Sequence, residues 1–271
     1  MPISGADPVP ISLLSRMTRT PRKAGRVAIA AKHHERARRR PNEVQIGVIL
    51  TFVAGAVDAG GFLLLGQFTA HMSGNASSMA DHLHSGAWLV VLAGVAAFLP
   101  FLAGAAVSAM LIGGRLRYGG RSPFVPALLL ESSLLLAFAG FYPTIRAASY
   151  GTDLAIAILS FAMGLQNATS TSLSITRMRT TQVTGIATDL GLELGRLLYW
   201  NRRRGSARGP AVVADRAKLA KVGILLLSFL AGGFAGASGF SSFGPISCAA
   251  LAIIVLMLAC WMWRGSTEAF S

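Results

Sequence analysis

The chain has 271 residues, a net charge of +14 and 53% hydrophobic residues, whereas only 13% of its residues are charged. This composition excludes an ordinary soluble domain, because the apolar residues come in long runs and not at amphipathic spacing. The basic charge could suggest a nucleic-acid partner, but Lys and Arg gather in blocks between the apolar runs. That distribution is typical of a membrane protein.

Six apolar runs follow one another, and they define the expected fold class. Each run is close to the ~17–25 residues that a helix needs to cross the hydrocarbon layer of a bilayer. The pattern predicts an all-α fold, a polytopic membrane helix bundle with six transmembrane helices in contact with the lipid bilayer. The runs cover residues 46–65, 86–112, 124–141, 154–174, 222–243 and 246–263.

The basic blocks predict the orientation of the chain. They lie at 16–40, 115–121, 177–221 and Arg264, whereas segment 67–85 contains no Lys or Arg. With six helices and a cytoplasmic N-terminus, every block falls on the cytoplasmic side, and Arg146 alone falls outside. Because short cytoplasmic loops carry the excess of basic residues, we expect both termini in the cytoplasm.

The chain divides into an arm and a transmembrane domain. Residues 1–43 contain five prolines and the run RARRR at 36–40, which predicts a disordered basic cytoplasmic arm. The arm has no apolar core typical of a secretory signal, and no interleaved aromatic residues that would favour nucleic-acid binding. The transmembrane domain covers 44–265 with a basic cytoplasmic loop at 200–221, and 266–271 form a short cytoplasmic tail.

The two halves of the domain share motifs in the same order. Because each half holds three predicted helices, an odd number, the second half must enter the membrane from the opposite side. We therefore predict an inverted 3+3 repeat, with repeat one at 44–143 and repeat two at 152–264. The matched residues are Gly55 with Gly164, Asp58 with Asn167, Ser73-Gly74 with Thr184-Gly185, and Phe101-Leu-Ala-Gly104 with Phe229-Leu-Ala-Gly232.

Polar residues inside the apolar runs are the candidate substrate- or ion-binding groups. An ionised Asp58 near the middle of the first helix would cost several kcal/mol, so it must face other helices or a wet cavity. Asn167, its counterpart, follows Gln166 and begins a polar patch in the fourth helix. Glu131 is a second intramembrane carboxyl group. Each of these residues could instead form hydrogen bonds that hold helices together.

Two Ser/Thr-Gly turns and a set of glycines complete the candidate list. Ser73 and Asn75 flank Gly74, and Thr184 occupies the matching position in the second half, so we expect half-buried helix breaks there. Whether segments 67–85 and 176–199 re-enter the membrane stays open. Six glycines are expected to allow close helix packing: Gly55, Gly60, Gly61, Gly104, Gly164 and Gly232.

Motifs of enzymes and metal proteins are missing from the sequence. There is no nucleotide-binding GxxxxGK[ST] loop, no HExxH and no GxSxG. Cys248 and Cys260 lie too far apart along one helix to bridge each other, and His71, His82 and His84 are too loosely spaced to indicate a metal site. We expect neither an enzyme nor a protein with a metal or cofactor.

The segment from Gly55 to Asn75, paired with GLQNA and VTG from Gly164 to Gly185, resembles the YoaK family, bacterial inner-membrane proteins grouped as a domain of unknown function. The likeness covers about residues 44–264. The family pattern has TGN in both copies, whereas this chain has Ser73-Gly74-Asn75 and Thr184-Gly185-Ile186. The resemblance implies an integral protein of the bacterial inner membrane and supplies no substrate.

The leading hypothesis is a small secondary transporter or channel-like protein with Asp58 and Asn167 close together at the bilayer midplane. Its partner would be a small solute or ion. Glycines in the second and fifth helices also favour a homodimer. The alternative is a non-transporting membrane scaffold or sensor, in which the same polar residues only hold the helices together.

Overall fold

The computed structural model describes residues 42–118, 122–173, 183–199 and 212–268. The predicted basic arm therefore lies outside the described residues, except for the start of the first helix. Most of the predicted loop 200–221 also lies outside them, and its last six residues are helical.

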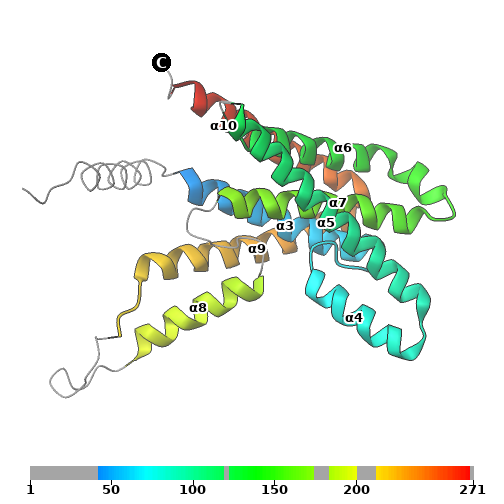
Figure 1. The fold of residues 1–271 in the computed structure, drawn as a ribbon, viewed down its shortest axis with the longest axis horizontal. Helices are drawn as coiled ribbons and strands as arrows, with labels where there is room; N and C mark the ends of the chain where they lie inside the picture. The colour runs from blue at the N-terminus through cyan, green and yellow to red at the C-terminus, as the bar shows by residue number, and fades with distance from the viewer. Residues whose placement is uncertain (1–41, 119–121, 174–182, 200–211, 269–271) are drawn as a thin grey trace, which may run out of the picture. The chain divides into compact units, whose positions relative to one another are not determined.

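All regular structure in these ranges is helical (Figure 1). The long helices coincide with the six apolar runs, so the all-helical fold is confirmed. The helices are α3 (Asn42–Leu65), α4 (Met72–Ser85), α5 (Trp88–Arg117), α6 (Val125–Ala147), α7 (Gly151–Leu173), α8 (Val183–Leu198), α9 (Arg216–Phe243) and α10 (Ser247–Glu268), and the 3-10 turn Gly244–Ile246 separates the last two.

Five stretches of the described residues are long and apolar enough to cross a membrane. Four of them are single helices: Val44–Leu65, Trp88–Arg117, Val125–Ala147 and Gly151–Leu173. The fifth, Arg216–Arg264, has 49 residues and contains both α9 and α10. Gly244 lies between these two helices with φ +63°, a conformation that favours glycine.

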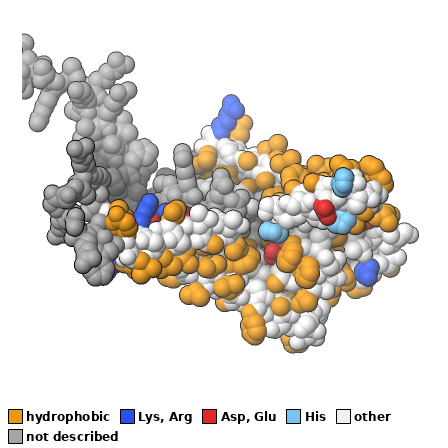
Figure 2. Space-filling model, turned by 90° about the horizontal axis from the view of Figure 1, so that it is seen from below, with side chains coloured by type: hydrophobic (Ala, Val, Ile, Leu, Met, Phe, Trp, Pro, Cys, Tyr) orange, Lys and Arg blue, Asp and Glu red, His pale blue; other side chains and the backbone are white. Residues whose placement is uncertain are grey.

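The long helices are apolar all round, and their outward side chains stay exposed. Leu99, Leu102, Met110, Leu227 and Phe234 each have more than half of their surface exposed. Figure 2 shows hydrophobic side chains spread over the described face, with His and acidic side chains gathered at the end that carries α4. An exposed apolar surface of this extent is typical of helices that face lipid.

The core brings together residues from both halves. Its largest fully buried side chains include Leu50 on α3, Leu128 and Phe138 on α6, and Leu159 on α7. Helix α6 packs against α7 and α10, and Ser132 donates a 2.8 Å hydrogen bond to the carbonyl oxygen of Ala252 on α10. Lipid is as apolar as these side chains, so close packing is what holds such helices together.

Glycine contacts join α3 to α9. A Cβ atom at Gly55 would overlap the carbonyl oxygen of Phe229 on α9, and a Cβ at Gly232 would overlap the carbonyl oxygen of Phe52 on α3. The two backbones therefore touch where neither residue has a side chain. The equivalent contact joins α7 to α5.

At the contact between α5 and α7, a Cβ at Gly164 of α7 would overlap the carbonyl oxygen of Phe101, and a Cβ at Gly104 of α5 would overlap the carbonyl oxygen of Phe161. Gly164 matches Gly55, and Gly104 matches Gly232. The same backbone contact is thus made twice, each time between one helix of the first half and one helix of the second.

The segments after α3 and α7 contain helices, which the sequence did not predict. Helix α4 packs on α5, and α8 packs on α9. Ser73-Gly74-Asn75 lies in the first turn of α4, and Thr184-Gly185-Ile186 lies in the first turn of α8. Both motifs therefore lie within helices, and the expected helix breaks at them are wrong. In the first half the break comes before the motif, at residues 66–71.

Polar contacts fix α8 to the start of α9. The buried carboxylate of Glu193 accepts hydrogen bonds from Arg196 Nη1 (2.7 Å) and from the backbone N–H of Asp215 (3.0 Å). Asp189 binds Lys218 at 3.0 Å. Asp215 in turn caps α9 by accepting from the N–H groups of Ala217 and Lys218.

Candidate functional site

The connecting segment between α3 and α4, residues 66–71, is organised by Asp58. Helix α3 ends at Leu65, and Gly66 follows it with a φ of +74°, which favours glycine. Asp58 Oδ1 accepts hydrogen bonds from the backbone N–H groups of Thr69 (3.1 Å) and Ala70 (2.8 Å). The acid of the motif therefore binds the backbone eleven and twelve residues further along the chain.

Two amide side chains complete this arrangement. Asn75, which is buried in the first turn of α4, donates through Nδ2 to the carbonyl oxygen of Phe68 (3.2 Å). Gln67 donates through Nε2 to the carbonyl oxygen of Ala93 on α5 (3.3 Å). The connecting segment is thus attached to α3, α4 and α5 through three side chains.

A cavity of about 380 Å³, called the α4 cavity below, adjoins the connecting segment. The polar side chains in its lining are Gln67, His71, Asn75 and Ser78, from the connecting segment and α4. Phe68 stacks on the ring of Phe62 at 4.4 Å and meets His71 edge-on at 6.0 Å. Amide, imidazole and hydroxyl groups beside aromatic rings suit a small polar solute or ion.

Asn167 does not lie at the level of Asp58. Gln166 Nε2 donates to the carbonyl oxygen of Leu50 on α3 (3.1 Å), whereas Gly61 lies opposite Leu159. Helices α3 and α7 are therefore antiparallel, and Asn167 lies near the level of Leu50. Asp58 is eight residues further along α3, about 12 Å at the rise of an α-helix. The expected midplane pair is not formed.

Other polar residues of α7 contact neighbouring helices. Thr169 Oγ1 lies 2.8 Å from Ser108 Oγ on α5 and also donates to the carbonyl oxygen of Leu165. Asn167 is half-buried, and its own carbonyl oxygen accepts from Thr171. Gln166 and Thr169 of this polar patch thus bond to α3 and α5, whereas Thr171 bonds within its own helix.

The remaining candidates lie apart from the α4 cavity. Glu131 is fully buried in α6, and neither carboxyl oxygen has a hydrogen-bond partner among the described residues. Ser73 and Thr184 are exposed. The structure thus gathers Asp58 and Asn75 at the connecting segment, Gln166 and Asn167 on α7, and leaves Ser73 and Thr184 at the surface.

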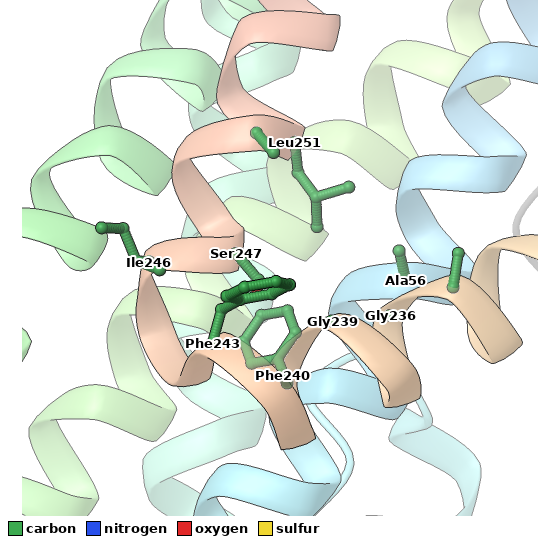
Figure 3. Close-up of a pocket in the computed structure, with 10 residues that line it drawn as sticks. Ala56, Gly236, Gly239, Phe240, Phe243, Ile246, Ser247 and Leu251 are labelled. Atoms are coloured by element: carbon green, nitrogen blue, oxygen red, sulfur yellow. The ribbon is translucent and has the colours of Figure 1, made fainter.

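A second cavity lies between α9 and α10 and is apolar (Figure 3). It has a volume of about 400 Å³, and in Figure 3 the rings of Phe240 and Phe243 lie between Ile246 on one side and Ala56 on the other. Ser247 supplies the hydroxyl group in its lining. Because Phe243 and Ile246 are exposed, this hollow suits hydrocarbon better than a polar solute. In the described ranges, no three His, Cys, Asp or Glu side chains gather to hold a metal ion.

Residues 46–262 match the family model described as "Protein of unknown function (DUF1275)". The chain belongs to this family. It is also 27% identical over 184 residues to the UPF0700 transmembrane protein YoaK of Bacillus subtilis (strain 168), covering 66% of this chain and 80% of that relative. No solved structure matches. The resemblance to the YoaK family is confirmed, and the chain is an integral membrane protein in contact with the bilayer.

Sequence reasoning missed the partners of Asp58 and the contributions of Gln67, His71 and Ser78 to a cavity. Gln67 and Ser78 gave no signal, because single polar residues in a segment rich in Ser and His are ordinary. For Asp58 the sequence did contain a signal. A carboxylate near the end of a helix can bind backbone N–H groups in the segment that follows the helix. Only the fold shows that it does.

Proposed function

We propose that the chain is a small membrane transport protein built from two inverted halves, residues 44–143 and 152–264. The observation that carries this proposal is the repeated glycine contact. Gly55 and Gly164 occupy matching positions, and each meets a matching phenylalanine carbonyl on a helix of the other half. Inverted repeats that pack across their pseudo-symmetry axis are typical of secondary transporters.

The two short helices support the same proposal. Helices α4 and α8 have 14 and 16 residues, which is about 21 and 24 Å, whereas the hydrocarbon layer is ~30 Å thick. They follow matching long helices and pack on matching long helices, and in Figure 1 both run outward from the middle, α4 to the right and α8 to the left. Half-length helices of this kind form the binding sites of many transporters.

Six transmembrane spans follow if α9 and α10 cross separately. A single span of 49 residues would be about 73 Å long, far more than a bilayer accommodates. The described basic residues at the ends of α5, α8 and α10 and at the start of α9 then share one side, the cytoplasm of a bacterium. Both termini would lie on that side of the inner membrane.

The transported species would enter through the α4 cavity. Asp58 and Asn75 shape the wall of this cavity by holding the connecting segment. Because the glycine contacts join the two halves tightly, the moving parts would be α4 and α8 rather than the long helices. A small solute or ion fits the lining, and the proposal gives the chain no catalytic role. A homodimer would need surfaces other than Gly104 and Gly232, which contact helices of their own chain.

Cysteine accessibility tests transport without knowledge of the substrate. Ser78→Cys would be placed in the α4 cavity of a Cys248→Ala, Cys260→Ala background and treated with a membrane-impermeant maleimide. Right-side-out cells expose the outer side, and inverted vesicles expose the inner side. We expect Ser78→Cys to react from both sides, because a transport protein opens its site to each side in turn.

Reaction from the outer side alone would reject transport, since the cavity would then be only a surface hollow. Native Cys248, which is fully buried in α10, is the matched control: kept as the cysteine of a Cys260→Ala variant, it should react from neither side. Proton or solute flux into reconstituted vesicles, compared with Asp58→Asn, would then identify the transported species.

A non-transporting scaffold is the second candidate, and one observation favours it. Asp58, Asn75 and Gln67 all bind backbone groups of their own half, which is what a purely structural role requires. In a scaffold, Asp58→Asn and Asn167→Ala would lower thermal stability and leave every flux unchanged. One-sided labelling of Ser78→Cys would favour the scaffold independently of any flux measurement.

A further inference from the structure

Glu131 is an uncompensated carboxyl group inside a membrane-spanning helix. Its side chain is fully buried, and both oxygens lack a hydrogen-bond partner among the described residues. Its neighbours on the same face of α6, Leu128 and Leu135, are also fully buried and belong to the apolar core. The proposed transport path through the α4 cavity does not use this group.

Gln166 lies at the level of Glu131 on the adjacent helix. Helices α6 and α7 form a hairpin in which Gly151 contacts the carbonyl of Ile145. Glu131 lies 14 residues before Ile145, and Gln166 lies 15 residues after Gly151. At 1.5 Å per residue these are about 21 Å and about 22 Å from the turn.

Gln166 and Ser170 also keep oxygen atoms without partners. Both side chains are buried, and they lie four residues apart on one face of α7. Gln166 uses Nε2 to bind Leu50, whereas its Oε1 has no partner among the described residues, and neither has Ser170 Oγ. Gln166 Oε1 and the two oxygens of Glu131 are thus dehydrated oxygen atoms at similar depth on adjacent helices, whereas Ser170 lies about 6 Å further along α7.

Within the described ranges, no positive charge lies near an ionised Glu131. Asp58 lies about 12 Å along α3 from Leu50, and Asp153 lies about 20 Å along α7 from Gln166. The arginines lie at the exposed ends of α5 and α10. The described titratable or cationic side chains of the helices around α6 are Asp58, Arg115, Arg117, Asp153, Cys248, Cys260 and Arg264, with Tyr142 and Arg146 on α6 itself.

An isolated carboxylate in such a place has lost its hydration and gains no partner in exchange, so the group takes up a proton instead. We propose that Glu131 and Gln166 form a proton-binding site within the membrane, in which neutral Glu131 donates its proton to Gln166 Oε1. A role for this site in coupling proton movement to transport rests on the proposed transport function.

Infrared difference spectroscopy of the reconstituted protein tests the site directly. A neutral carboxyl group gives a C=O stretching band separate from those of carboxylates and amides. At neutral pH we expect this band in the unaltered protein, its persistence in Asp58→Asn, and its complete loss in Glu131→Gln. Asp153→Asn, which changes an exposed carboxyl group on α7, is the matched control and should keep the band.

A band that survives in Glu131→Gln, or no band in the unaltered protein, would overturn the proposal. If Glu131→Gln does not fold, carboxyl-¹³C glutamate labelling of the unaltered protein replaces it: the band must shift, and an unshifted band would overturn the site. These measurements need no transport, so they separate failure of the proton site from failure of the transport proposal, which the two-sided labelling of Ser78→Cys tests.

Discussion

Gly164→Ala should weaken the contact between α5 and α7. The new Cβ would lie 2.7 Å from the carbonyl carbon of Phe101. Carbon atoms pack at ~3.5–4.0 Å, so the helices must separate by at least about 0.8 Å. A gap of ~0.5–1 Å already removes a quarter to a half of each dispersion contact across the interface. Overpacking of this kind costs ~1–3 kcal/mol, and we expect the upper part of that range because the obstacle is backbone.

Denaturant titration in detergent, followed by circular dichroism, measures the free energy of unfolding. Gly140→Ala is the matched control, because Gly140 lies in α6 with no atom within 4 Å of the new Cβ. It should be neutral or stabilise by ~0.5–1 kcal/mol, as alanine does in a helix. Gly232→Ala in the other contact should resemble Gly164→Ala. If Gly164→Ala and Gly140→Ala unfold with equal free energies, the backbone contact does not carry the packing.

Three further predictions use the same unfolding assay. Asp58→Ala should cost ~2–4 kcal/mol, because it leaves two backbone N–H groups without an acceptor. Asp58→Asn should cost less, because its amide oxygen still accepts. Equal losses in the two variants would contradict a role for Asp58 as the acceptor of these bonds. Gly66→Ala should cost ~1–2 kcal/mol through its φ of +74°, with Gly66→Asn closer to the unaltered protein. Glu193→Ala should cost ~1–3 kcal/mol and speed hydrogen exchange in α8. Glu193→Gln can still accept from the N–H of Asp215 and should have a smaller effect. Unchanged exchange in both variants would show that Glu193 does not hold α8.

The long helices could be predicted from the sequence because length and hydrophobicity alone determine them. A run of apolar residues between basic blocks has no other stable form in a bilayer. Helices α4 and α8 were missed for the opposite reason. Their segments combine Ser, Gly, His and Thr, which resemble a loop, and they become helical because a long neighbouring helix offers a packing surface.

The position of Asp58 relative to Asn167 could not be predicted from matched motifs. Two residues related by an inverted repeat coincide only on the pseudo-symmetry axis, and elsewhere they lie on opposite sides of it. In the proposed inverted repeat, the antiparallel pairing of Leu50 with Gln166 and Gly61 with Leu159 would place the axis between these levels. Asp58 and Asn167 then fall on either side of it. The relative level of two packed helices depends on which of their glycines contact a neighbouring backbone, and this cannot be read from the sequence.

Hydrogen bonding separates the polar residues of the membrane domain into two groups. Asp58 and Asn75 use their hydrogen bonds to hold the connecting segment, so their loss would first change the fold. Glu131 and Gln166 keep unpaired oxygens in a dehydrated core, where an apolar side chain of similar size is often more stable. Structural hydrogen bonds therefore explain the conspicuous motif around Asp58. They do not explain Glu131 in α6. Function inside the membrane should be sought first where a polar group lowers stability and contributes nothing to the fold.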